Sequence, residues 1–175
     1  IAVEFAGILN GYGTAVTQLY RGELFMRGFD HAIRVHLAEE MLKKGVDLQF
    51  NTNIVRIEKT PAGLVATLED GTTMETDCVP HATGHHPNTK NLGLENAGVE
   101  QTDGGAIPVD EEFRTSVPNI FAIGDVIDRF QLTPVAIGEA MVVSGNLFNG
   151  QSRKMDYADI PTAVFSNPPV GTVGL

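Results

Sequence analysis

One cysteine, no tryptophan, few basic residues and no long hydrophobic run set the first limits on this 175-residue sequence. A single thiol excludes an internal disulfide framework and any dithiol redox centre made by this chain alone, and it fits a cytoplasmic setting. Since no apolar stretch approaches the roughly 20 residues of a membrane-spanning helix, we expect no membrane partner. The 12 Lys and Arg residues stand against 22 Asp and Glu, and the net charge of −10 argues against nucleic acid as a partner.

The most informative stretch begins with a short apolar segment, residues 119–123, that follows Pro118. Its length and composition predict a buried strand, which ends at Gly124 and Asp125. The glycine allows a sharp turn and a close approach to a ligand, and a carboxylate at the carboxyl end of a strand suits the hydroxyl groups of a sugar or sugar alcohol. A capping role for Asp125 in an ordinary strand–turn–helix unit is the alternative, because a lone Gly-Asp pair is a weak signal.

A helix is predicted directly behind this turn, over residues 135–148. Leu132 and Thr133 open it, and Pro134 suits its first turn, where a missing N–H group costs little. The free backbone N–H groups at the start of this helix are expected to face the same site as Asp125.

The start of the chain has the pattern of a dinucleotide-binding βαβ unit, with a helix over residues 1–13 and a strand over residues 15–20. This strand ends at Arg21, and Arg27 lies shortly after it. Sites for NAD usually place an acidic residue here, whereas two guanidinium groups can hold the 2′-phosphate of NADP in a bidentate manner. We therefore expect NADPH as the cofactor, with a pair of solvated surface arginines as the alternative.

A second helix and a β-meander are predicted next. Asp30 is expected to cap a helix over residues 31–44. Alternating apolar and polar residues then predict strands at 46–50, 54–58, 64–68 and 73–76. Asp70-Gly71 is a strong hairpin signal between the last two strands. Cys78 lies in a short apolar run, and we expect a buried core thiol.

Three histidines, His81, His85 and His86, fall in one short segment that follows Pro80. Without a nearby cysteine or carboxylate they would form a poor metal cage, so we expect no metal site. Further along, residues 92–97 predict a short helix, and residues 103–110 predict a turn that leads into a strand.

The string that ends in Phe121-Ala-Ile-Gly-Asp125 resembles the second flavin-binding motif of the FAD-dependent pyridine nucleotide–disulfide oxidoreductases. In that family the motif's aspartate lies on the ribitol of FAD. The resemblance implies this role for Asp125, with Gly124 allowing the close approach. It also implies that Leu132 and Thr133 lie beside the flavin ring.

Ile1-Ala-Val-Glu4 resembles the end of the same family's dinucleotide-binding fingerprint. This resemblance assigns Ile1 and Glu4 to the cofactor site, with Glu4 near the nicotinamide and the flavin. NADPH-dependent members of the family carry two arginines at the spacing of Arg21 and Arg27, which implies that both hold NADPH.

Residues 82–88 resemble a further family segment, Ala-(Thr/Ile)-Gly-Arg-x-Pro-Asn, and this adds Gly84 and His85 to the cofactor site. His85 stands where the family has an arginine that helps to hold the nicotinamide nucleotide. A neutral histidine keeps a hydrogen bond but loses the fixed charge, so we expect weaker NADPH binding.

The predicted fold class is α/β. A Rossmann-like NADP-binding βαβ domain with a β-meander is expected over residues 1–87, the C-terminal part of an FAD-binding domain over 88–157, and the start of an α+β dimer interface domain over 158–175. The string that begins at Pro168-Pro169 favours the glutathione reductase branch of the family. We expect both chain ends to be truncations, with a strand and a glycine-rich loop preceding Ile1.

The resemblance implies hydride transfer from NADPH through FAD to a redox-active disulfide, which then reduces glutathione disulfide, in a homodimer. The family's cysteine pair and His-Glu relay are expected outside this chain. No residue here is therefore assigned as a catalytic acid, base or nucleophile, and we expect the chain alone to be inactive. A trypanothione, mercuric or dihydrolipoyl reductase is the alternative within the family. A non-catalytic nucleotide-binding module is the alternative for the chain as given.

Overall fold

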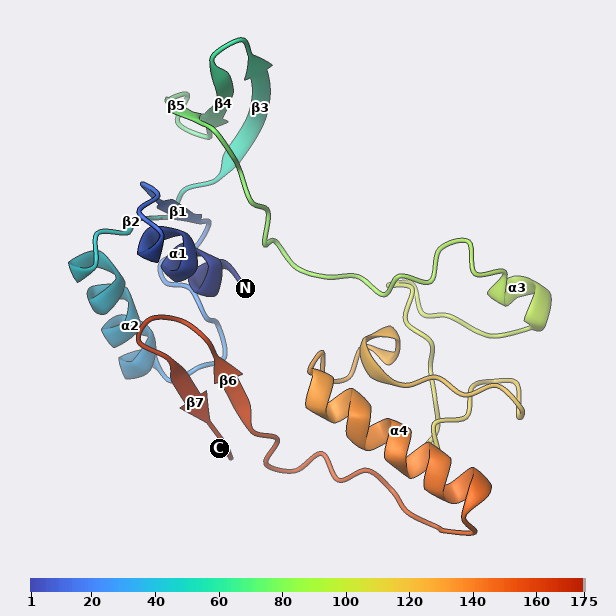
Figure 1. The fold of residues 1–175 in the computed structure, drawn as a ribbon. Coiled ribbons are helices and arrows are strands. Elements are labelled where there is room, and N and C mark those ends of the chain that lie inside the picture. The colour runs from blue at the N-terminus through green and yellow to red at the C-terminus, as the bar shows by residue number, and fades with distance from the viewer. Residues whose placement is uncertain (175) are drawn as a thin grey trace. The chain divides into compact units, whose positions relative to one another are not determined.

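A computed structural model describes residues 1–174, which divide into two units (Figure 1). The first unit comprises Ile1–Thr83 and Pro161–Val173, and the second comprises Gly84–Ile160 together with Gly174. Leu175, the last residue of the predicted interface domain, lies outside the described residues. The model mixes helices and sheets, as expected for the α/β class.

The first unit opens with a helix–strand–helix–strand succession: α1 (Ala2–Gly11), β1 (Thr17–Tyr20), α2 (His31–Lys43) and β2 (Asp47–Phe50). β1 and β2 pair in parallel, with Tyr20 opposite Phe50 at their carboxyl ends. A parallel pair joined through a helix is a βαβ unit, formed here by β1, α2 and β2. The helix and strand predicted at the start of the chain are α1 and β1.

The sequence sets the ends of α2 clearly. Asp30 caps its first turn, since the carboxylate accepts hydrogen bonds from the N–H groups of Ala32 at 2.9 Å and Ile33 at 3.3 Å. Beyond the C-terminal end, Gly45 has a φ of +90°, a backbone conformation that favours glycine. Both predicted ends are confirmed.

The core of the first unit lies between the parallel strands and the two helices. Leu37 and Met41 on α2 are almost fully buried and pack with Val3 and Ala6 of α1. Their four-residue spacing places them on one face of α2, as the sequence predicts.

A three-stranded antiparallel meander follows, made of β3 (Ile54–Thr60), β4 (Gly63–Leu68) and β5 (Thr73–Thr76). β4 and β5 meet at the Asp70-Gly71 turn, where the Asp70 carboxylate accepts a hydrogen bond from the N–H group of Thr72 at 2.9 Å. The meander and its turn are confirmed.

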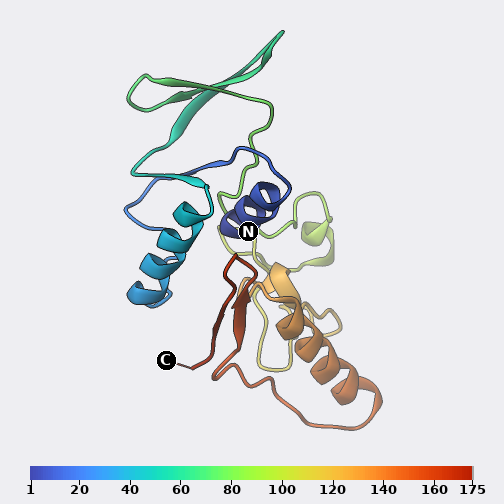
Figure 2. The same ribbon diagram turned by 60° about the vertical axis from the view of Figure 1, so that its left-hand side comes forward.

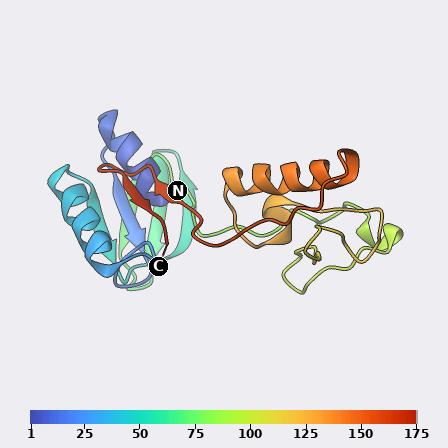
Figure 3. The ribbon, with the colours of Figure 1, turned by 90° about the horizontal axis from the view of Figure 1, so that it is seen from below.

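The C-terminal residues of the first unit form an antiparallel hairpin of β6 (Thr162–Val164) and β7 (Val170–Thr172). Val164 and Val170 pack on the core of this unit, and Figure 3 shows the hairpin alongside α1. The turn of the hairpin is tied to α2, because the Lys44 ammonium donates a hydrogen bond to the Asn167 side chain.

The second unit contains α3 (Leu94–Ala97), the 3₁₀ helix η1 (Gly124–Ile127) and α4 (Thr133–Phe148). η1 packs against α4 (Figure 2). The core around them includes Phe113, Ile127 and Val142. Pro134 lies in the first turn of α4, as the sequence predicts.

Two predicted strands are wrong. Residues 119–123 form no strand in the described part of the chain, where a single bridge joins Phe121 to Arg114. The turn predicted over residues 103–110 leads into no strand either, because only the bridge at Arg114 follows it directly. A strand needs a partner along its length. The apolar run therefore keeps an extended backbone at Ile123 without becoming part of a sheet.

The predicted burial of Cys78 is also wrong, since this thiol is exposed. Cys78 lies just after β5, and its N–H group donates a hydrogen bond to the Thr76 hydroxyl at 3.4 Å. Pro80 and its neighbours then continue without secondary structure, so no sheet covers the sulfur.

Candidate functional site

The loop after β1 carries Arg21 and Arg27, both exposed. Neither forms an ion pair with any of residues 1–174. An unpaired guanidinium group is free to bind an anion, and the loop lies at the carboxyl end of a parallel strand, where open α/β sheets bind ligands.

This loop is fixed by its backbone and by one buried side chain. The carbonyl oxygen of Gly22 accepts a hydrogen bond from the N–H group of Asn51 at 2.9 Å, just beyond β2. Phe25 is 3% exposed and belongs to the core of the first unit. The two arginines therefore extend from an ordered loop.

Arg34 on α2 strengthens this anchoring and was not singled out from the sequence. Its guanidinium group donates hydrogen bonds to two loop carbonyl oxygens, those of Phe25 at 2.7 Å and Leu24. A part-buried arginine that binds two carbonyl groups is structural, in contrast to exposed Arg21 and Arg27. Nothing in the sequence separates these roles, because the difference depends on which side of the loop faces α2.

Glu4 lies in the first turn of α1 and contacts a segment far away in the sequence. Its Oε1 accepts a hydrogen bond from the N–H group of Phe165 at 2.8 Å. The hydrogen bond from Phe165 is the main cause that lowers the pKa of Glu4, and partial burial opposes it. Glu4 is therefore held ionised, and its carboxylate joins α1 to the β6–β7 hairpin.

A groove of about 480 Å³ opens beside this contact. Glu4, Gly7, Tyr12 and Phe165 are among its lining residues. The sequence did not indicate that the segment around Phe165 would border Glu4.

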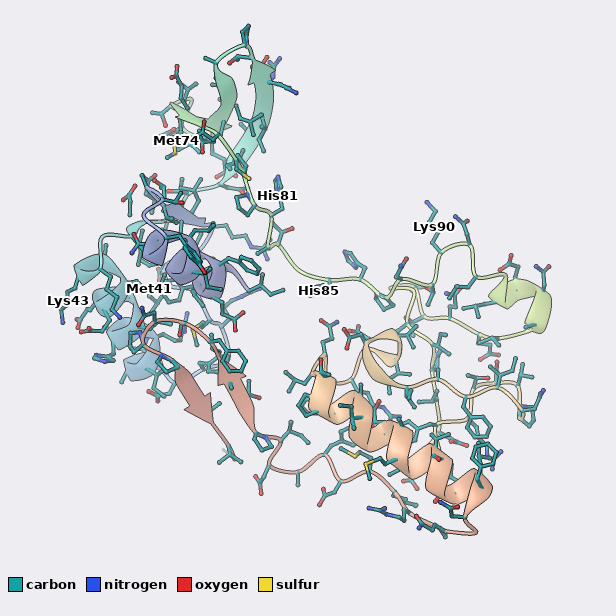
Figure 4. The ribbon with its side chains drawn as sticks, in the orientation of Figure 1. Met41, Lys43, Met74, His81, His85 and Lys90 are labelled. Atoms are coloured by element: carbon teal, nitrogen blue, oxygen red, sulfur yellow. The ribbon has the colours of Figure 1, made fainter. Side chains whose placement is uncertain are left out.

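Gly84 and His85 lie in the segment that follows Thr83. His85 is exposed, and Gly84 has a φ of +129°, which favours glycine. Figure 4 shows His81 and His85 along this segment after β5. Within residues 1–174, no group of three or more His, Cys, Asp or Glu side chains could hold a metal ion.

In the second unit, Gly124 and Asp125 open η1 instead of ending a strand. Gly124 has a φ of +72°, and a Cβ atom there would lie 3.1 Å from the Cβ atom of Ala136 on α4. Only glycine fits this turn without strain. The side chain of Asp125 is exposed and makes no hydrogen bond or ion pair among residues 1–174.

Leu132 and Thr133 lie at the start of α4, as predicted. Leu132 is the N-cap residue and is half-buried, whereas Thr133 is exposed. The Leu132 carbonyl oxygen accepts the hydrogen bond from the N–H group of Ala136 at 3.1 Å. Because η1 packs on α4, the structure brings this helix start together with the Gly124 turn within one unit.

One functional candidate of this unit was missed in the sequence. Glu139 on α4 is 1% exposed, and its Oε2 accepts a hydrogen bond from the N–H group of Gly124 at 2.6 Å. Its Oε1 accepts a hydrogen bond from the hydroxyl group of Tyr157 at 2.7 Å. A lone carboxylate in the apolar run Val135–Val143 was the signal available in the sequence.

An aromatic and a basic side chain lie against the Tyr157 ring. Phe130 stacks on the Tyr157 ring at 5.6 Å, and the Arg129 guanidinium group lies 5.6 Å from the ring centre. Burial is the main cause that raises the pKa of Tyr157, and its hydrogen bond with Glu139 adds to this. Tyr157 therefore serves Glu139 as a neutral hydrogen-bond donor.

These features define an α/β protein with a βαβ nucleotide-binding unit and a separate glycine–aspartate turn packed on a helix. The chain matches the family described as Pyridine nucleotide-disulphide oxidoreductase over residues 1–140. It belongs to this family.

The chain resembles three longer proteins of known kind. It is 46% identical to a glutathione reductase from Burkholderia cepacia over 175 residues, and 47% identical to a trypanothione reductase from Trypanosoma congolense over 179. Both matches cover 100% of this chain, but only 39% and 36% of those relatives. The solved structure of the HOCl-induced flavoprotein disulfide reductase RclA from Escherichia coli matches 99% of this chain and 40% of its own, with a TM-score of 0.92 and 31% identity.

The chain therefore spans about two fifths of the length of such relatives. Across residues 1–174, the structure contains no helix with the length and apolar character needed to cross a membrane.

Proposed function

We propose that this chain is the nucleotide-binding part of an NADPH-dependent, FAD-containing disulfide reductase that acts on glutathione disulfide as a cytoplasmic homodimer. The net reaction transfers two electrons from NADPH to the disulfide, releasing NADP⁺ and two thiols after uptake of one proton. The observation that carries this proposal is the loop after β1, where Arg21 and Arg27 extend without ion-pair partners in the described chain.

The residues of the first unit fit NADPH. Only NADPH carries a 2′-phosphate, and two free guanidinium groups at the carboxyl end of β1 suit a dianionic group. Hydrogen bonds to the loop backbone fix the Cα positions of the two arginines. Less conformational entropy is therefore lost when their side chains bind a ligand. By the family resemblance, Ile1 and Glu4 of this unit also belong to the cofactor site. The resemblance adds Gly84 and His85, which lie at the start of the second unit.

The residues of the second unit fit FAD. Gly124 brings the backbone into a tight turn, and the exposed carboxylate of Asp125 is free to accept a hydrogen bond from a ribitol hydroxyl group. Leu132 and Thr133 are proposed to lie beside the flavin ring. When bound, FAD accepts a hydride from NADPH and passes electrons to a disulfide.

The chain's own contribution is to bind and orient these nucleotides. The single cysteine supplies no dithiol, so we assign the redox disulfide and the proton-transferring residues to other parts of the full-length protein. Glu4 is the residue of this chain that we place nearest to the reacting rings. Its ionised carboxylate and its hydrogen bond to the N–H group of Phe165 set its position.

A trypanothione reductase is the second candidate. The chain is 47% identical in sequence to a trypanothione reductase and 46% identical to a glutathione reductase, so sequence identity does not separate the two. A mercuric reductase is not separated from these by any residue of the chain. A dihydrolipoyl reductase is less favoured, since that branch normally has a glutamate where Tyr20 stands. A non-catalytic nucleotide-binding module is the alternative outside the enzymes.

The test of substrate is an assay of the full-length protein with NADPH and three disulfides: glutathione disulfide, trypanothione disulfide and lipoamide. We expect the highest kcat/KM with glutathione disulfide. A higher value for trypanothione disulfide would move the assignment to the second candidate. Flavin binding without reduction of any disulfide would favour the non-catalytic module.

The flavin assignment has its own test, at Asp125. In the full-length protein, Asp125→Ala leaves a ribitol hydroxyl group without an acceptor, at a cost of about 1–3 kcal/mol, or roughly five- to 150-fold in FAD affinity. Asp125→Asn should cost less, because the amide oxygen still accepts. We expect the alanine variant to lose FAD on dialysis and to regain activity when FAD is added, with little change in the KM for NADPH. Full retention of flavin would show that the Asp125 carboxylate does not hold FAD.

A further inference from the structure

Glu139 is a carboxylate that the proposed function does not use, and it is the most buried acidic side chain described in the structure, at 1% exposed. Its two oxygens accept hydrogen bonds from different parts of the second unit. One comes from the N–H group of Gly124 at 2.6 Å, and the other from the Tyr157 hydroxyl group at 2.7 Å. Two accepting oxygens are the arrangement expected of an ionised carboxylate.

Burying the Glu139 carboxylate costs free energy, so packing alone does not explain a glutamate at this position. No ion pair to Glu139 is formed by residues 1–174, and the nearby Arg129 instead reaches the Tyr157 oxygen at 3.5 Å. An isolated buried carboxylate is unfavourable unless hydrogen bonds satisfy it. The other buried side chains of α4, those of Val135 and Val142, are apolar. An apolar residue would satisfy packing here at lower cost, so the carboxylate must be needed for its hydrogen bonds.

The hydrogen bond to Gly124 fixes the turn that carries Asp125. A Cβ atom on Gly124 would lie 3.1 Å from Ala136, so the turn is pressed against α4 one turn before Glu139. On the side of the turn that faces α4, the N–H group of Gly124 donates its hydrogen bond to Glu139. The next side chain, that of Asp125, is exposed and free of partners within residues 1–174. The bond is buried and short, and it therefore restrains the backbone at the residue before the proposed flavin ligand.

We propose that Glu139 is a positioning residue for flavin binding: by holding the N–H group of Gly124, it sets the direction of the Asp125 carboxylate. This inference rests on the proposed function, because it takes the Gly124–Asp125 turn to be the flavin site. Glu139 itself touches no cofactor. It acts through the backbone of Gly124, and Tyr157 orients its carboxylate.

The test compares two variants of similar volume in the full-length protein, Glu139→Gln and Glu139→Met. The glutamine keeps an oxygen that can accept from Gly124, whereas the methionine fills the space without an acceptor. We expect Glu139→Met to weaken FAD binding at least tenfold, measured by quenching of flavin fluorescence. Glu139→Gln should stay within about threefold of the wild type. The KM for NADPH should change little in both.

Two further readouts separate positioning from loss of stability. Hydrogen exchange of the Gly124 amide should speed up in Glu139→Met but not in Glu139→Gln. Met141→Gln, on the exposed face of the same helix, is the matched control and should leave both FAD affinity and Gly124 exchange unchanged. If Glu139→Met does not fold, Glu139→Asp replaces it: the charge stays, but the oxygen is withdrawn by one methylene, and FAD binding should still weaken.

The outcomes distinguish this inference from the proposed function. If Asp125→Ala weakens FAD binding but Glu139→Met and Glu139→Asp keep wild-type affinity, the positioning role is wrong and the flavin assignment stands. If neither Asp125→Ala nor the Glu139 variants weaken FAD binding, the turn is not the flavin site. An equal loss in Glu139→Gln and Glu139→Met would also overturn the role of the accepting oxygen.

Discussion

Three arginines near the loop after β1 have two different tasks. Arg34 is part-buried, and its guanidinium group donates hydrogen bonds to backbone carbonyl groups of the first unit, so it stabilises the loop. Arg21 and Arg27 are exposed and have no ion-pair partner among residues 1–174. An ordered backbone that carries guanidinium groups without ion-pair partners is well suited to binding a phosphate group.

Replacing Arg21 and Arg27 together by alanine should therefore separate the two nicotinamide cofactors. Each lost charge-assisted contact with the 2′-phosphate should cost about 1.5–3 kcal/mol, so the KM for NADPH should rise about a hundredfold or more. NADH has no 2′-phosphate, and its KM should stay nearly constant. Steady-state kinetics of the full-length protein with both cofactors measures the difference.

The matched control is Arg56→Ala, which removes an exposed guanidinium group that pairs with Glu58 on the meander. This variant should leave both KM values unchanged. Equal losses for NADPH and NADH in the double variant would mean that Arg21 and Arg27 serve another purpose.

The sequence indicates candidate ligand-binding residues more readily than the residues that support them. Arg21 and Asp125 are such candidates, because residue type and neighbouring pattern indicate their chemistry, and their binding roles stay predictions. Arg34 and Glu139 could not, since their roles depend on contacts with segments 9 and 15 residues away. A hydrogen bond from a side chain to a distant backbone group leaves no local pattern in the sequence.

At the scale of elements, predictions from local sequence signals were correct more often than predictions that depend on long-range strand pairing. The α2 ends and the meander were predicted correctly, because a capping aspartate, a terminal glycine and an Asp-Gly turn act within a few residues. The strand over residues 119–123 was wrong, because apolar composition predicts burial but not the presence of a pairing partner. Cys78 is exposed for a related reason: its short apolar run also pairs with no strand among residues 1–174, so no sheet covers the thiol.

The contact between α1 and the β6–β7 hairpin is an element-scale feature with a testable pH dependence. The N–H group of Phe165 lowers the pKa of Glu4 below its unfolded value of about 4.3. A lowered pKa means that the contact stabilises the docked hairpin above this unfolded value and is lost as the pH falls through the lower, folded pKa. We expect exchange of the Phe165 amide hydrogen to rise at acid pH, beyond its intrinsic pH dependence, as measured by NMR.

Two variants locate the cause. Glu4→Ala should expose the Phe165 amide hydrogen at every pH, because no acceptor remains. Glu4→Gln should keep much of its protection and lose the acid transition, since an amide accepts without titrating. An acid transition that persists in Glu4→Gln would assign the effect to a group other than Glu4.

At the scale of the whole molecule, the chain divides its binding chemistry between two units. The candidate NADPH loop belongs to the first unit, and the candidate FAD turn belongs to the second. Each has its own hydrophobic core, around Leu37 in the first and Phe113 in the second. Each candidate segment therefore packs within its own unit, whereas reduction of a disulfide through a redox dithiol requires a second cysteine that this chain does not have.

The 175-residue chain on its own should consequently show no glutathione reductase activity. Reduction of a disulfide through a redox dithiol needs two sulfur atoms in one site, and this chain has one cysteine, Cys78, which is exposed. The measurement is NADPH oxidation in the presence of FAD and glutathione disulfide, with the full-length protein as the positive control. Cys78→Ser tests for thiol exchange between two chains, since it should leave the background rate unchanged. NADPH-dependent turnover by the chain that Arg21→Ala abolishes would contradict the assignment of the redox centre to other parts of the protein.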